Sequence, residues 1–113
     1  MSKTIKELAV ELTVVIALFC DNVKGRSVFV NQIIRSSSSI GANAQEAKYA
    51  QSKADFISKL QIALKECYES DYWLYLFKET NILSEDKYKQ MYDQCSKIRK
   101  LLIASINTAK ESK

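Results

Sequence analysis

Histidine is absent from this chain of 113 residues. Because histidine is the commonest general base and metal ligand in proteins, its absence removes most routes to a hydrolytic or metal-dependent site. Glu66 and Glu69 could suggest the di-iron site of some four-helix bundles, but that site needs a Glu-x-x-His motif. A serine nucleophile would lack its usual base, and no glycine-rich phosphate loop occurs. We therefore expect no enzyme activity, no bound metal and no cofactor.

Proline is also absent, and glycine occurs only as Gly25 and Gly41. Hydrophobic residues make up 47% of the chain and charged residues 27%, which is typical of a soluble, globular, helical protein. The length favours one domain over residues 1–113, large enough for a hydrophobic core of its own. Apart from a run of four serines, we find no repeat and no low-complexity segment.

Cysteine is scarce and widely spaced, at Cys20, Cys67 and Cys95. Three cysteines cannot all pair within one chain, and no C-x-x-C motif is present. Free cysteines usually behave as small buried hydrophobic residues. We therefore expect reduced thiols and a cytoplasmic protein.

Long apolar runs are missing as well. The most apolar stretch, Leu8 to Cys20, follows Lys3 and Lys6 and so has the outline of a signal peptide. Glu11 interrupts the stretch, however, and no small-residue cleavage site follows it. The stretch is also too short and too charged to span a membrane. We expect a core helix here and no membrane partner.

What the chain does contain is an apolar pattern with helical spacing along its whole length. We predict four helices, over residues 4–21, 27–48, 52–79 and 84–110. Each start has a hydroxyl residue that can cap the helix, namely Thr4, Ser27, Ser52 and Ser84. The breaks are short, so consecutive helices should pack antiparallel. The expected fold is all-α, an antiparallel up-down four-helix bundle.

The apolar spacing also predicts which side chains form the core. The expected core residues are Ile5, Leu8, Leu12, Val15, Ile16 and Phe19 in the first helix, Phe29, Ile33, Ser37, Ile40 and Ala44 in the second, Phe56, Ile57, Leu60, Ala63, Leu64, Cys67 and Leu74 in the third, and Tyr88, Met91, Tyr92, Cys95, Ile98, Leu102 and Ile106 in the fourth.

Two helices carry more apolar surface than one bundle core can use. The additional apolar stripes consist of Val10, Val14 and Ala17 on the first helix and Ile62, Trp73 and Leu76 on the third. Aligned second stripes usually mark a contact surface, so we predict a homo-oligomer with these residues at the interface. The alternative is that these are wide helix faces covered by loops.

The segment from Arg35 to Ala47 places four serines and other small residues where a helix would ordinarily carry large apolar ones. Serine hydroxyls weaken helix propensity because they can bond the nearby backbone. On a helical wheel Arg35, Ser39, Asn43 and Glu46 share one face. This face is either a polar site or seam between subunits, or ordinary solvated surface.

A net charge of +4 makes the chain mildly basic. This permits an anionic partner but falls short of the concentrated basic stripe of a dedicated nucleic-acid binder. The candidate contacts to nucleic acid are Lys24, Arg26, Lys48, Lys53, Lys97, Arg99 and Lys100. The aromatic side chains of Tyr68, Tyr72, Trp73, Tyr75 and Phe77 could stack on exposed bases, although core and interface packing is the more usual role at this spacing.

Two segments together resemble the family of four-helix bundle proteins first noted in intervening sequences of bacterial 23S ribosomal RNA. One is the arginine, serine-isoleucine, asparagine and acidic pattern of Arg35, Ser39-Ile40, Asn43 and Glu46. The other runs from Ile62 through Glu66, Glu69 and Trp73 to Leu83. The resemblance implies a ring of five subunits with a central channel. It also implies that Arg35, Ser39, Asn43, Glu46, Glu66 and Glu69 form a polar network or subunit seam.

The accessory proteins of diversity-generating retroelements are similar to this family, and they bind a reverse transcriptase and nucleic acid through a basic ring. Our leading hypothesis is therefore a non-enzymatic oligomeric scaffold that binds RNA or DNA, or a nucleic-acid-processing partner such as a reverse transcriptase. The alternative is a protein-interaction module that does not bind nucleic acid.

Overall fold

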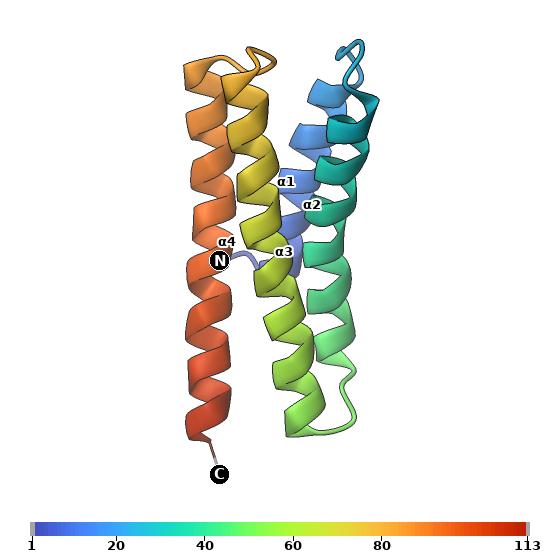
Figure 1. The fold of residues 1–113 in the computed structure, drawn as a ribbon. Helices are drawn as coiled ribbons and strands as arrows, with labels where there is room; N and C mark the ends of the chain where they lie inside the picture. The colour runs from blue at the N-terminus through green and yellow to red at the C-terminus, as the bar shows by residue number, and fades with distance from the viewer. Residues whose placement is uncertain (1, 113) are drawn as a thin grey trace.

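The computed structural model describes residues 2–112, which form four α-helices (Figure 1). These are α1 (Ile5–Cys20), α2 (Ser27–Lys48), α3 (Lys53–Glu79) and α4 (Glu85–Glu111). Figure 1 shows the chain reversing at each connection, so neighbouring helices run antiparallel. Helix α1 packs against α2 and α4, and α3 packs against the same two helices. The expected all-α four-helix bundle is confirmed, and it measures 49 × 23 × 23 Å.

Local capping residues account for three of the four helix starts. Thr4 and Glu7 form a reciprocal capping box, in which the Glu7 amide donates to Thr4 Oγ1 (3.1 Å) and the Thr4 amide donates to Glu7 Oε1 (2.9 Å). The hydroxyls of Ser52 and Ser84 accept from amides three residues later. All eight helix ends lie within one residue of the predicted ranges.

The start of α2 differs from the prediction. Ser27 is already the first helical residue, so it cannot cap the helix. The cap position belongs to Arg26, whose backbone is left-handed (φ 55°) and whose side chain caps nothing. Gly25 before it is also left-handed (φ 77°). Two successive left-handed residues turn the chain sharply, and this geometry replaces the expected serine cap.

The core contains most of the predicted apolar residues, with one clear error. Val15 was expected inside but is 39% exposed. The buried residues of α1 are Ala9, Leu12, Ile16 and Cys20, and their spacing rotates the helix so that Val15 lies off the core side. Several buried residues were not predicted, among them Ser36, Ala47, Ser70 and Phe77.

The serine run of α2 lies at closely packed helix contacts. Ser36 and Ser37 are fully buried. The Ser36 hydroxyl accepts from the Ser70 hydroxyl of α3 (3.0 Å), and the Ser37 carbonyl accepts from Thr13 Oγ1 of α1 (3.1 Å). Small side chains therefore let α2 approach both of its neighbours while their polar groups stay hydrogen-bonded.

Helix α1 is shorter than the other three and begins partway along the bundle (Figure 1). The bundle end at the α2–α3 connection therefore consists of three helices. A pocket of about 650 Å³ lies below the start of α1, and its apolar lining includes Ala44, Ala47, Phe56 and Leu60. Within residues 2–112, no helix is both long enough and apolar enough to cross a membrane.

Candidate functional site

A polar cluster spans α2 and α3 around Arg35. The Arg35 guanidinium donates to Glu66 Oε2 (3.1 Å) and forms a second ion pair with Glu69. Glu69 also accepts from the indole N–H of Trp73 (3.1 Å). The two carboxylates and the indole are three or four residues apart, so helical spacing places all three beside Arg35. This arrangement links α2 to α3 and leaves the Arg35 side chain about half exposed.

The rest of the predicted polar face does not join this cluster. The Asn43 side-chain amide donates to the backbone carbonyl of Ser39 within the same helix (2.9 Å). Glu46 instead pairs with Lys59 of α3, with Oε1 and Nζ 3.6 Å apart. The structure thus brings Arg35 together with Glu66 and Glu69, while Asn43 bonds within α2 and Glu46 pairs separately with α3.

A second polar seam joins α3 to α4 around Asp71 and Arg99. The two side chains form an ion pair that is mostly shielded from solvent, and Arg99 also donates to Ser96 Oγ (3.1 Å). Asp71 Oδ1 is buried with no hydrogen-bond partner in the described part of the chain. Burial raises the pKa of the Asp71 carboxyl, and the Cys95 thiol and Arg99 oppose that rise.

Tyrosine rings flank the cations of this seam. The Arg99 guanidinium carbon lies 5.7 Å from the ring centroid of Tyr68 and 5.6 Å from that of Tyr92. Further along, Lys78 Nζ lies 5.2 Å from the Tyr75 centroid and 4.9 Å from the Tyr88 centroid. Each cation is therefore within cation–π range of one ring from α3 and one from α4.

The three cysteines are free and buried. The Cys95 thiol donates to the backbone carbonyl of Cys67 (3.5 Å). Its hydrogen bond with Cys67, together with burial, raises the pKa of the Cys95 thiol well above its ordinary value. Such a thiol stays protonated and unreactive at neutral pH. Within residues 2–112, no three Cys, Asp or Glu side chains gather closely enough to hold a metal ion.

The two predicted interface stripes differ in how much of their surface is exposed in a single chain. Val10 and Val14 of α1 are each 49% exposed, and Ala17 is partly buried. On α3, Ile62 is exposed and Leu76 is partly buried. Trp73 packs inside the chain, with its ring centroid 6.0 Å from that of Phe29. The α1 stripe is therefore the more open of the two.

Leu18, which was not among the predicted interface residues, is 63% exposed and extends the α1 stripe. The pattern that could have revealed it is the four-residue spacing from Val10 through Val14 to Leu18. No charged residue lies between Glu11 and Asp21, so this side of α1 is apolar over more than two turns.

The seven predicted nucleic-acid contacts lie in three separate places. Lys24 and Arg26 belong to the α1–α2 connection, Lys48 and Lys53 flank the α2–α3 connection, and Lys97, Arg99 and Lys100 share one turn of α4. Arg99 differs from the other two residues of that turn because Asp71 compensates its charge. Lys97 and Lys100 are exposed.

A family model described as 23S rRNA-intervening sequence protein matches residues 2–104. The chain belongs to this family. The match confirms the resemblance seen in the segments around Arg35 and Glu66. Within the single chain, Arg35 is joined to Glu66 and Glu69, whereas Asn43 donates to the Ser39 carbonyl of its own helix.

A crystal structure from Bacteroides thetaiotaomicron, of a protein of unknown function in the S23 ribosomal protein family, is similar to this chain with a TM-score of 0.86. The two sequences are 42% identical over 91% of this chain and 98% of the other. A comparison with curated proteins found no match. Both matches agree on the family of this chain, and neither description names an enzymatic activity.

Proposed function

We propose that this member of the 23S rRNA-intervening sequence family is a non-enzymatic accessory protein that assembles into a homo-oligomer and binds RNA. The observation that carries the proposal is the charge of α4. From Gln94 to Lys110 this helix has no acidic residue. Arg99 in this stretch is paired with Asp71, while Lys97, Lys100 and Lys110 are exposed cations. Phosphate contacts from lysine and arginine supply most of the affinity of sequence-independent nucleic-acid binding.

Self-association would strengthen that binding. A single chain carries a net charge of only +4, whereas an oligomer presents several such surfaces in one particle. The apolar stripe of Val10, Val14 and Leu18 supports self-association, because an aligned exposed apolar surface on a small soluble domain usually marks a contact. The family resemblance favours a ring of five chains.

The direct test is a filter-binding titration of the purified protein against a structured RNA at several salt concentrations. We expect affinity to fall steeply with salt, because each phosphate contact releases a counterion. The proposal would be refuted if no binding occurred at low salt, or if the affinity did not change with salt concentration.

A paired variant locates the contact. Replacing Lys97 and Lys100 together with Gln should weaken binding and reduce the log–log salt slope by about 1 to 2. The matched control is Lys87→Gln with Lys89→Gln, two exposed lysines of the same helix outside the Gln94–Lys110 stretch. Equal loss in both double variants would mean that net charge alone is responsible.

The competing function is that of a protein-interaction module that does not itself bind nucleic acid. Its partner could be a nucleic-acid-processing enzyme. Co-purification of a protein partner that survives nuclease treatment, from a chain that does not bind RNA in the titration, would replace our proposal with that one.

A further inference from the structure

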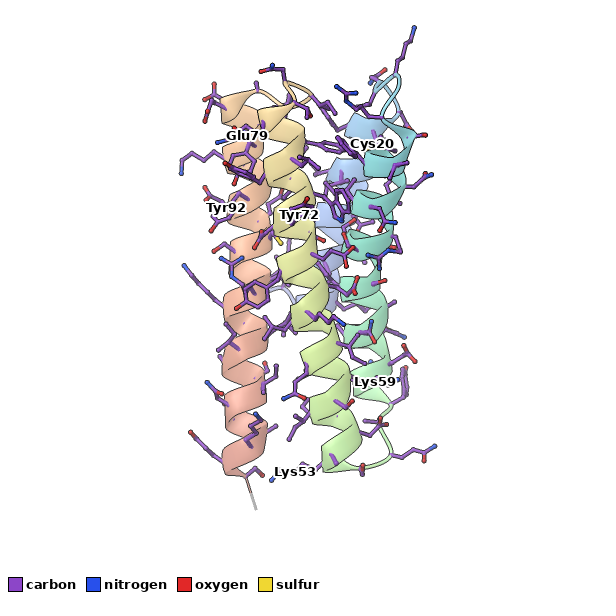
Figure 2. The ribbon with its side chains drawn as sticks, in the orientation of Figure 1. Cys20, Lys53, Lys59, Tyr72, Glu79 and Tyr92 are labelled. Atoms are coloured by element: carbon purple, nitrogen blue, oxygen red, sulfur yellow. The ribbon has the colours of Figure 1, made fainter. Side chains whose placement is uncertain are left out.

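The outer side of the α3–α4 seam carries a row of five tyrosines. Three come from α3 (Tyr68, Tyr72 and Tyr75) and two from α4 (Tyr88 and Tyr92). We call this row the tyrosine face. The three tyrosines of α3 are 54%, 56% and 49% exposed, respectively. Tyr72 and Tyr92 project from the two neighbouring helices in Figure 2.

Contacts between the rings and two cations link four of the five tyrosines. Tyr72 lies one turn after Tyr68 on the same side of α3, and its ring contacts that of Trp73, with centroids 5.0 Å apart. Arg99 bridges Tyr68 to Tyr92, and Lys78 bridges Tyr75 to Tyr88. The centroids of Tyr88 and Tyr92 are 5.8 Å apart, which joins the two bridged pairs. A connected series of four rings and two cations, in the order Tyr68, Arg99, Tyr92, Tyr88, Lys78 and Tyr75, therefore runs along the seam.

Contacts within the chain order part of the row. Asp71 and Ser96 fix the Arg99 guanidinium, and Arg99 in turn positions the rings of Tyr68 and Tyr92. Binding to a surface that is already ordered loses less conformational entropy than binding to loose side chains. Tyrosine also contributes a large contact area with few rotatable bonds.

We propose that the tyrosine face binds unpaired bases of a single-stranded nucleic acid by stacking. This inference rests on the proposed function and names the form of nucleic acid and the residues that contact it. Exposed tyrosine rings stack on bases of any sequence, and flanking cations add to that attraction. Bases inside a duplex already stack on one another, so a duplex offers these rings no free base surface.

Carboxylates pair both bridging cations, Arg99 with Asp71 and Lys78 with Glu79 and Glu85 (3.8 and 3.9 Å), so contacts to phosphate would come from other lysines. On α4 the acid-free stretch continues from Arg99 through Lys100 to Lys110, and Lys65 precedes Tyr68 by one turn of α3. A strand whose bases stack on the tyrosines has these lysines available for its phosphates. The apolar stripe of α1, by contrast, is aliphatic and lacks charge, as expected of a protein contact.

The test compares a fluorescein-labelled oligouridine or oligoadenine of about 12 nucleotides with the same strand annealed to its complement, by fluorescence anisotropy at fixed salt. The wild-type chain should bind the single strand more tightly than the duplex. Tyr72→Ala should weaken single-strand binding about five- to one-hundredfold and barely change duplex binding, since stacking on one ring contributes that much.

Two further variants sharpen the comparison. Tyr72→Phe keeps the ring and should keep the affinity, because stacking does not need the hydroxyl. Tyr49→Ala removes another exposed tyrosine, which lies outside the face and has Lys48 Nζ 5.7 Å from its ring centroid, and it should bind like wild type. Circular dichroism melting curves confirm that each variant is folded.

The outcomes separate this inference from the proposed function. If Tyr72→Ala and Tyr75→Ala bind the single strand like wild type while salt-dependent RNA binding persists, the stacking face is refuted and the function stands. If the wild type binds neither form, the proposed function fails as well. If Tyr72→Ala instead changes the particle mass in light scattering, the face is an interface between copies and the inference is overturned.

Discussion

Two buried serine hydroxyls show how α2 accepts residues that disfavour helices. Ser70 Oγ of α3 donates to Ser36 Oγ (3.0 Å), and Ser36 Oγ lies 3.3 Å from the Ile33 carbonyl, to which it donates. One hydroxyl is thus both acceptor and donor, and neither group needs water. The low helix propensity of the serine run is offset by a satisfied polar contact between helices.

Replacement of Ser36 should therefore cost more than its helix propensity suggests. We expect Ser36→Ala to lower the free energy of unfolding by about 1–2 kcal/mol, because the Ser70 hydroxyl loses its buried partner. Ser38 is exposed and donates only to the Arg35 carbonyl, so Ser38→Ala should be neutral or slightly stabilising. Urea unfolding of both variants measures the difference, and equal stabilities would contradict this account.

Individual polar residues could be placed on a helix face from the sequence, but their partners could not. The helical spacing predicted the polar face that contains Arg35. It did not predict that the Asn43 amide donates to a carbonyl of its own helix, or that Glu46 pairs with Lys59. The partner of Asp71 is Arg99, which lies 28 residues further on in α4. Such pairings depend on how two helices are rotated against each other, and one-dimensional periodicity does not contain that information.

At the scale of the helices, prediction succeeded where the determinants are local. The starts of α1, α3 and α4 follow from capping residues that lie within three positions of the helix. The start of α2 depends on a turn in which Gly25 and Arg26 both have a left-handed backbone, and no pattern of side chains predicts that turn. The misplacement of Val15 has a similar cause, because α2 and α4 together decide which side of α1 is covered.

The two glycines give opposite predictions within the same chain. A Cβ atom at Gly41 would meet only Ala9 Cβ, at an ordinary contact distance of 3.5 Å. Gly41→Ala should therefore raise the free energy of unfolding by about 0.5–1 kcal/mol through better helix propensity. Gly25 has open space around it but a left-handed backbone (φ 77°), so Gly25→Ala should cost about 1 kcal/mol or more.

Thermal or urea unfolding of both alanine variants tests this pair. If Gly41→Ala is clearly destabilising, α1 and α2 approach more closely at that point than the geometry indicates. If Gly25→Ala is neutral, the connection can adopt another backbone conformation.

For the whole molecule, the arrangement of the helices leaves the apolar side of α1 uncovered by any other segment of residues 2–112. The α1 stripe is the best candidate for a contact between copies of the chain. The α3 stripe is a poorer candidate because Trp73 packs against Phe29 of the same chain. Trp73 variants would therefore disturb the fold together with any interface, and Val14 offers a cleaner test.

We expect Val14→Lys to reduce the mass of the particle in solution, because the interface would have to bury an unpaired charge. The matched control is Val28→Lys, which makes the same change at a more exposed valine in the first turn of α2. Ile62→Lys tests the α3 stripe separately. Light scattering at equal concentrations reports the masses, and a folded Val14→Lys variant with the wild-type mass would exclude the α1 stripe as an interface.

The central claim is that assembly and nucleic-acid binding occur in the same particle. Sedimentation velocity at low salt, detected through a fluorescent single-stranded RNA, tests both parts at once. We predict that the RNA sediments with a particle several times heavier than one 12.9 kDa chain. RNA that sediments free, or with a single chain only, would contradict the account.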